Sequence, residues 1–315
     1  MQFNPCMKHK LIRNSVRHFA ETELAPIAAE IDRNATFPLD VIEKMKKLNY
    51  FGLQVPKGFG GAAMDSISAE TTAVKKNKEY ILNGTKIFVT NGGVCDLALI
   101  FALTNTDQTR LQSSVFIVES GFPGFLRGEL EDLCGMRANP VSSLFLEDCR
   151  VPEKNLLGKL GDGMKIGMAT LDNGRIGVAA QALSIAQGAF EAAVKYAKER
   201  QQFKKPIASL QTIQNYIADM ATEIAAARLL LYRACSLKDE GAPFGCEAAM
   251  AKLYCSQVAA KTTSLAVQIH GGYGYSKEYD VERYFRDAKV TEIYEGTSEI
   301  QRLVIARSVL SKLTL

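Results

Sequence analysis

The chain has 315 residues, 47% of them hydrophobic, and its 38 basic and 34 acidic residues give a formal net charge of +4. This length predicts about two domains with sizeable cores, and the charges are interspersed, without the Lys/Arg block that binds nucleic acid or anionic lipid. The charge pattern therefore predicts no nucleic-acid partner. No apolar run approaches the roughly 18 residues of a membrane-spanning helix, so we expect no membrane partner either.

The first predicted region is helical. Apolar residues recur at helical spacing from about Lys8 to Ile31, and a second helical stretch begins near Asp40 and runs to about Leu48. These stretches predict an N-terminal helical domain over residues 1–68.

The second region, from Thr71 to Pro152, predicts a small β domain because its apolar residues fall into short runs separated by turn residues. Asn83-Gly84 is such a turn signal. The domain is expected to span residues 69–157. Its expected strands cover Tyr80–Leu82, Lys86–Thr90, Leu97–Leu103, Val115–Val118 and Leu144–Leu146.

The third region, over residues 158–315, is helical again. Apolar residues from Leu210 to Leu231 mark one long amphipathic face, and pauses near Lys205-Pro206 and from Gly241 to Pro243 separate the helices. The expected fold class is therefore mainly α with a β domain: an N-terminal helical domain that is apparently incomplete, a small middle β domain and a C-terminal four-helix bundle.

Cysteine and histidine usage argues against a disulfide framework and against a metal site. The cysteines are odd in number and lack a C-x-x-C pair, which favours reduced thiols. The histidines stand apart from any cluster of ligands. The residues are Cys6, Cys95, Cys134, Cys149, Cys235, Cys246, Cys255, His9, His18 and His270.

A lone carboxylate, Glu295, stands out on a glycine-flanked turn in the run RDAKVTEIYEGTSEIQR. Ser298 and Gln301 form a capping-box pattern, so a helix is expected to start there, with Glu295 just outside it. On spacing alone such a carboxylate is more often solvated. Bulky Ile293 and Tyr294 are instead expected to wall it with apolar surface, which suits a general base, and Gly296 permits close approach of a ligand.

The YEGT sequence resembles the catalytic loop of the acyl-CoA dehydrogenases, flavoenzymes that oxidise the Cα–Cβ bond of acyl-CoA thioesters. The similarity covers almost the whole chain. It implies that Glu295 removes the α-proton while a hydride leaves Cβ for FAD. Some relatives carry the base in an L-D-x-x-R motif, which here runs from Leu171 to Arg175 and has Gly174 at the alternative position.

The same resemblance assigns a cofactor and a substrate site. Asp172, Arg175 and Gly296 are expected at the acyl-CoA, although on spacing alone Asp172 and Arg175 form a surface ion pair. The thioester carbonyl is expected to accept hydrogen bonds from the Glu295 backbone N–H and from the flavin. The expected FAD contacts are Phe88, Val89, Thr90, Arg200, Phe203, Gln211, Gln268, Gly271, Gly272, Thr297 and Glu299. Of these, Arg200, Phe203 and Gln211 are expected to hold the diphosphate and adenine of the FAD of a neighbouring subunit.

The FAD assignments have alternatives that the residues alone leave open. Phe88 is equally suited to a strand core, the stretch around Arg200 to a solvated helix end, and Gly271-Gly272 to a helix C-cap. Lys204 departs from the family, in which most members have Gly at this position.

A segment of several tens of residues found in the family is missing near Ser68 and Ala69. We expect that the polypeptide carries this segment and that the sequence omits it, because a true deletion would uncover apolar helix faces.

The resulting interpretation is an FAD-dependent dehydrogenase of short-chain, butyryl-type acyl-CoA that passes electrons to an electron-transferring flavoprotein and forms a homotetramer. The expected location is the bacterial cytoplasm, or the mitochondrial matrix in a eukaryote. Alternatives are a branched-chain or cyclic acyl-CoA dehydrogenase, an enoyl-CoA reductase, and a non-catalytic, truncated scaffold of the same fold.

Overall fold

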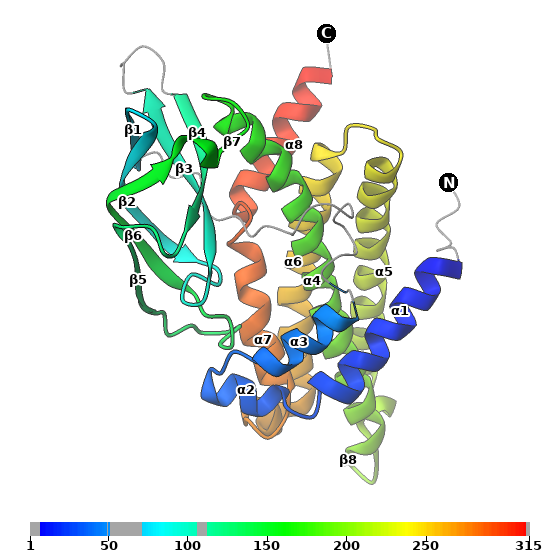
Figure 1. Cartoon of the computed structure of the whole chain (residues 1–315). Helices are drawn as coiled ribbons and strands as arrows, with labels where there is room; N and C mark the ends of the chain where they lie inside the picture. Colours follow the sequence, from blue (N-terminus) through cyan, green and yellow to red (C-terminus); the bar gives the residue numbers. More distant parts are fainter. Residues whose placement is uncertain (1–6, 49, 51–70, 106–111, 313–315) are drawn as a thin grey trace. The chain divides into compact units, whose positions relative to one another are not determined.

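A computed structural model describes residues 7–48, 50, 71–105 and 112–312 (Figure 1). Contacts group the chain into two compact units. The helical unit comprises Met1–Arg17, Cys134–Met136 and Leu171–Leu315, and the sheet unit comprises His18–Leu133 and Arg137–Thr170. The predicted gap near Ser68 lies outside the described residues.

The sheet unit begins with short helices and continues into one seven-stranded sheet. Its strand order is β5-β6-β2-β1-β3-β4-β7, and every neighbouring pair is antiparallel except β1 with β3. The helices are α2 (Ala28–Asn34) and α3 (Leu39–Lys47), after a π-helix at Ala20–Leu24. The strands are β1 (Thr72–Lys76), β2 (Glu79–Val89), β3 (Leu97–Asn105), β4 (Gln112–Glu119), β5 (Phe125–Leu130), β6 (Ser142–Pro152) and β7 (Leu156–Leu157).

Asn83-Gly84 does not form the predicted turn. Both residues lie inside the continuous strand β2, where the pairing with β6 shifts register between Leu82 and Gly84. Gly84 has a φ of 146°, and a Cβ there would stand 2.8 Å from the Thr71 Cα. The glycine therefore serves a β-bulge and a close backbone approach, which is the other common use of glycine in a strand.

The helical unit contains α1 (Met7–Phe19) up to Arg17 and five further helices. They are α4 (Gly163–Glu199), which begins in the sheet unit, and α5 (Gln211–Asp239), α6 (Gly245–His270), α7 (Val281–Lys289) and α8 (Ser298–Lys312). Helix α6 contacts α5, α7 and α8 and has buried residues on several faces.

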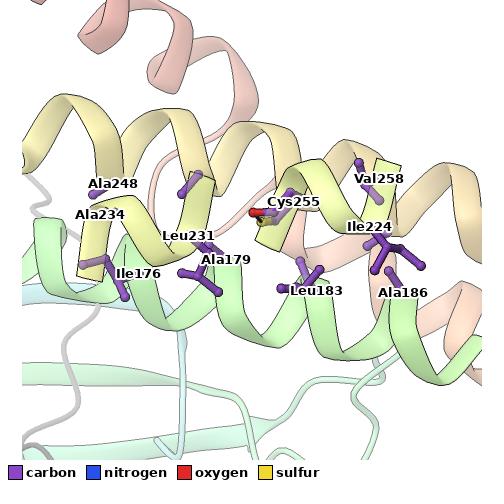
Figure 2. Close-up of a cluster of buried hydrophobic side chains, with 14 of the residues drawn as sticks. Ile176, Ala179, Leu183, Ala186, Ile224, Leu231, Ala234, Ala248, Cys255 and Val258 are labelled. Atoms are coloured by element: carbon purple, nitrogen blue, oxygen red, sulfur yellow. Dashed lines mark hydrogen bonds between the residues drawn. The ribbon is translucent and has the colours of Figure 1, made fainter. Parts of the chain in front are cut away.

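Small side chains let α4, α5 and α6 approach closely. Ala179, Leu183 and Ala186 recur at helical spacing along α4 and meet Ile224 and Leu231 of α5 and Cys255 and Val258 of α6 (Figure 2). A close-packed contact of this kind maximises dispersion between the helices. The bundle core is thus continuous along α4.

The connection between α4 and α5 is a small hairpin, β8 (Gln201–Gln202) with β9 (Lys205–Pro206). Its two central residues, Phe203 and Lys204, have φ values of 53° and 65°. This is the left-handed pair of a tight hairpin, where Asn-Gly is preferred because other side chains are strained. Lys204 therefore adopts the conformation that a glycine would favour.

The predicted fold class, mainly α with a β domain, is confirmed. The predicted division into three domains, over residues 1–68, 69–157 and 158–315, stays a prediction. The pauses at Lys205-Pro206 and Gly241–Pro243 separate α4, α5 and α6 as expected.

Candidate active site

Glu295 lies on a strained loop between a 3-10 turn at Val290–Glu292 and helix α8. Its φ is 53° and that of Gly296 is 88°, so two successive residues are left-handed. A non-glycine residue in this region costs about 1–3 kcal/mol and persists only where the surroundings enforce it. The loop must therefore be held from outside.

Two buried donors hold the loop through its carbonyl groups. The Gln301 Nε2 donates to the carbonyls of Glu295, at 3.1 Å, and Gly296, at 2.8 Å. The Lys252 Nζ also donates to the Gly296 carbonyl, at 2.7 Å. Gln301 and Lys252 are both fully buried, so these hydrogen bonds form away from water.

The predicted capping box is wrong in detail. Ser298 is the first helical residue, and Thr297 is the cap, because its Oγ1 accepts from the Ile300 N–H at 3.4 Å. Gln301 reaches back past the cap to the loop carbonyls instead of forming a box with Ser298. Glu295 still lies just before the helix, as predicted.

The Glu295 carboxylate lies against Gly174 of helix α4. A Cβ placed on Gly174 would stand 2.1 Å from the Glu295 Oε2 and 2.6 Å from its Cδ. The two base positions that the resemblance implies therefore share one volume in this protein. Glycine at 174 leaves that volume to the loop carboxylate.

Of the two residues expected to wall the carboxylate, Tyr294 is half-buried and Ile293 is exposed. Tyr294 is half-buried, its hydroxyl is hydrogen-bonded to the Gln181 Oε1, and burial raises the pKa of the phenol to about 12. Ile293 is 55% exposed and does not enclose the carboxylate within this chain.

Asp172 and Arg175 form an ion pair with 2.7 Å between Oδ1 and Nη1. The pair is not on the surface, because the Arg175 side chain is 3% exposed and that of Asp172 26%. The Arg175 Nε is buried without a hydrogen-bond partner. A Cβ on Gly245 would stand 2.9 Å from the Asp172 Oδ2, so this carboxylate lies at the positive N-terminus of α6.

A cavity of about 720 Å³ opens at the other end of the helical unit. It brings together three predicted cofactor residues, Arg200, Gly271 and Gly272. The Arg200 guanidinium lies 5.6 Å from the Tyr273 ring centroid. The cavity is lined by Tyr196, Arg200, Gln202, Ile207, Leu210, Ile213, Ile269, His270, Gly271, Gly272, Tyr273, Ser276 and Glu278.

This cavity fits the adenine dinucleotide end of FAD. Its volume suits a small-molecule site, and arginine is the cation best suited to a diphosphate. A Cβ on Gly271 or Gly272 would meet nothing within 4 Å, so a ligand can approach the backbone there. Burial lowers the pKa of His270, and the neutral ring stacks on Tyr196 with 4.1 Å between centroids.

Other predicted cofactor residues lie outside this cavity. Phe203, Gln211 and Gln268 are exposed in the helical unit, and Phe203 is the tip of the hairpin. Thr297 caps α8, and hydrogen bonds from the Glu299 backbone and from Thr297 lower the pKa of the exposed Glu299 carboxyl.

The remaining cofactor residues, Phe88, Val89 and Thr90, belong to the sheet unit. Phe88 is 60% exposed with a φ of 53°, so it is not a strand core residue. Val89 and Thr90 line a small hollow of about 50 Å³ together with Lys86. The exposed Phe88 ring is not part of the lining of this hollow.

Sequence reasoning missed Lys252, Gln181 and the role of Gln301. Lys252 had a signal, because it is the single charge in the run AAMAKLYCSQVAA. Gln181 had none, because its partner Tyr294 is 113 residues away.

Two absences concern only the described part of the chain. There, no helix is both long enough and apolar enough to cross a membrane. Nor do those residues contain a group of three or more His, Cys, Asp or Glu that could hold a metal ion.

Comparisons with known proteins find similarity at both ends of the chain. Residues 7–110 match the family model described as acyl-CoA dehydrogenase, N-terminal domain, and residues 161–310 match the one described as acyl-CoA dehydrogenase, C-terminal domain.

Two curated relatives cover nearly the whole chain. The acryloyl-CoA reductase (NADH) of Anaerotignum propionicum is 42% identical over 381 residues, covering 99% of this chain and 97% of the relative. The short-chain specific acyl-CoA dehydrogenase of Clostridium acetobutylicum is 40% identical over 377 residues, covering 98% and 100%. Both alignments exceed the 315 residues of this chain, so each relative has residues without a counterpart here.

Solved structures share the fold over the same extent. Butyryl-CoA dehydrogenase from Megasphaera elsdenii superposes with a TM-score of 0.93 at 36% identity, covering 98% of this chain and 100% of that one. A chain from a study of the electron transferring flavoprotein of Acidaminococcus fermentans and flavin-based electron bifurcation gives 0.93 at 40% identity, with the same coverage.

Proposed function

The chain belongs to the acyl-CoA dehydrogenase family, and from that premise we propose that this oxidoreductase dehydrogenates a short-chain acyl-CoA to the 2-enoyl-CoA, with Glu295 as the base. The observation that carries the proposal is the Glu295 carboxylate, which a strained loop holds against Gly174. Strain of this kind is maintained where a group must be presented in one orientation.

Glu295 takes the α-proton of the thioester onto its carboxylate. A general base must reach the proton it removes, and the volume beside Gly174 gives the carboxylate room to do so from the loop. In this proposal the Glu295 backbone N–H donates to the thioester carbonyl, where negative charge develops as the proton leaves.

Asp172 and Arg175 orient the CoA portion of the substrate. Their ion pair is partly buried, and the Asp172 side chain, at 26% exposure, is the accessible member of the pair. Gly296 is the third proposed substrate contact; its missing side chain leaves room for Gln301, whose Nε2 a Cβ there would approach to 2.7 Å.

Bound FAD supplies the hydride acceptor for the β-hydrogen. Arg200, which lines the 720 Å³ cavity, would hold the diphosphate and adenine of the FAD of a neighbouring subunit together with Phe203 and Gln211. Gln268, Gly271, Gly272, Thr297 and Glu299 would be further contacts of the dinucleotide. Phe88, Val89 and Thr90 contact its ring system. The predicted placement of the flavin between the β domain and the bundle stays a prediction.

The partners in this proposal are an electron-transferring flavoprotein and further copies of the chain in a homotetramer. The similarity to a chain from a study of such a flavoprotein supports the first partner. Size-exclusion chromatography with light scattering tests the second.

The experiment on the base compares the visible spectrum of the anaerobic holoenzyme before and after butyryl-CoA, in wild type and Glu295→Gln. The variant should keep its flavin but bleach it about 10²–10⁴-fold more slowly, because that is the range of general-base contributions. Glu240→Gln, an exposed carboxylate at the end of α5, is the matched control. Bleaching of Glu295→Gln at the wild-type rate would falsify the assignment.

A second candidate is the reverse reaction, reduction of a short 2-enoyl-CoA. The observation that favours it is the 42% identity to an acryloyl-CoA reductase. Adding acryloyl-CoA or crotonyl-CoA to the reduced holoenzyme and timing the return of flavin absorbance, against bleaching by butyryl-CoA, shows which direction the protein favours.

We also propose that the natural polypeptide carries a further segment near Ser68, since the relatives' alignments are longer than this chain. Intact mass of the purified protein tests this against the 34.5 kDa of the sequence. A mass equal to that value contradicts the proposal.

A further inference from the structure

A lysine is buried in the middle of helix α6, where a charge is costly. Lys252 is fully buried and lies among Ala248, Ala249, Ala251 and Cys255, which are also fully buried. A buried ammonium is rare unless it is paired, since its desolvation opposes folding. Burial lowers the pKa of Lys252 to about 8. Some gain elsewhere must offset this cost.

The Lys252 ammonium is directed to the catalytic loop. Its Nζ donates to the Gly296 carbonyl at 2.7 Å, one residue after Glu295. That carbonyl also accepts from Gln301, so it is fixed by two donors from two helices, α6 and α8. Because a peptide unit is planar, holding the Gly296 carbonyl also fixes the orientation of the peptide bond after Gly296. This bond directly follows the two left-handed residues, Glu295 and Gly296.

The charged groups that act on Lys252 lie on the 3-10 turn, the loop, α8 and α4. Glu292 of the 3-10 turn, Glu295 of the loop and Glu299 of α8 attract its charge, and Arg175 of α4 repels it. Three carboxylates and one guanidinium thus surround the ammonium. Its charge acts on Glu295 as well as on the backbone.

We propose that Lys252 is a positioning residue for the base: its ammonium anchors the Gly296 carbonyl and thereby keeps the Glu295 carboxylate turned toward Gly174 in its charged form. This inference rests on the function proposed above for Glu295. Lys252 acts through the loop, and no contact of it with the substrate is required.

The test replaces Lys252 by Met, which keeps the length of the side chain but removes its charge and its donors. Lys261→Met is the matched control, because Lys261 lies on the same helix, is exposed and pairs with Glu223. Both variants are prepared as holoenzymes and checked for flavin content. The first readout is exchange of the α-protons of butyryl-CoA with D2O, followed by NMR without an electron acceptor, which reports proton removal independently of turnover.

We expect Lys252→Met to slow this exchange about 10- to 100-fold, as for a base displaced by up to about 1 Å, while the Kd of butyryl-CoA changes less than threefold. The acid limb of the pH profile should move to higher pH, because a neighbouring cation favours the charged carboxylate. Lys252→Gln, which keeps one donor but no charge, should recover part of the rate without restoring the acid limb. Lys261→Met should match wild type.

A purely structural lysine would give a different pattern. Lys252→Met would then lose stability but exchange protons at the wild-type rate per folded molecule, with an unchanged pH profile, and the proposal would be overturned. Failure of both Lys252 variants to fold would also overturn it in favour of a structural role. If instead Glu295→Gln exchanges α-protons at the wild-type rate, the function proposed for Glu295 fails, whatever Lys252 does.

Discussion

Replacing Gly174 by alanine tests the geometry of the base with one methyl group. The added Cβ would stand 2.1 Å from the Glu295 Oε2, whereas side-chain Cβ atoms essentially never approach another atom within 3.0 Å. The carboxylate must therefore retreat by more than about 1 Å to restore an ordinary contact. A shift of that size at a reacting group can cost about 10²-fold in rate.

The effect on stability should be small, in contrast to the effect on rate. The displaced group is the end of a flexible side chain, and alanine is favoured over glycine inside a helix by about 1 kcal/mol. Gly177→Ala is the matched control, because Gly177 lies one turn further along α4 and a Cβ there would meet nothing within 4 Å.

The assay is anaerobic stopped-flow bleaching of the flavin by butyryl-CoA, with urea unfolding of the same preparations. Gly177→Ala should bleach at the wild-type rate and gain up to about 1 kcal/mol of unfolding free energy. Gly174→Ala should bleach about 10²-fold more slowly at a similar stability. A rate for Gly174→Ala within threefold of that for Gly177→Ala refutes the idea that the carboxylate works from this volume.

Three further predictions concern other sites. Arg200→Gln should raise the Kd of FAD about 10- to 100-fold, because it removes a charge-assisted hydrogen bond. The control is Lys198→Gln, an exposed residue in the last turn of α4, which should leave flavin retention on dialysis unchanged. Lys204→Gly should stabilise the protein by about 1 kcal/mol in urea unfolding, since it relieves a left-handed residue; a loss of stability would contradict this. Lys86 is buried, and burial lowers its pKa from 10.5 to about 8. Below pH 8 the Lys86 amine is protonated in both the folded and the unfolded protein, so the full cost of burying its charge opposes folding. Between about pH 8 and 10.5 the amine is protonated only in the unfolded protein. Wild type should therefore gain about 2–3 kcal/mol relative to Lys86→Met from pH 7 to 10, and a constant difference would refute it.

The sequence predicts the elements of this fold better than the contacts within its site. Periodicity locates the helices and the pauses between them, because burial of one helix face leaves a repeating pattern. Some local patterns are compatible with two structures. Asn83-Gly84 is typical of a turn as well as of a β-bulge, and the structure has the bulge. Ser298 with Gln301 matches a capping box, but in the structure Thr297 caps the helix.

Contacts between distant segments could not be predicted from local patterns. The Lys252 bond to Gly296 joins residues 44 apart, and the Glu295 carboxylate meets Gly174 from another helix. Neither pair leaves a periodic trace in the chain. The resemblance to the family identifies Glu295 and Gly174 as two possible base positions, but only the structure places them at one point.

The shared volume beside Gly174 restricts how such an enzyme can change by single steps. A carboxylate gained at position 174 while Glu295 remains would put two like charges into space sized for one, whereas loss of Glu295 first would remove the proposed base. Either order passes through an impaired protein. Descendants of this chain should therefore keep the loop base, unless a single event alters both positions together.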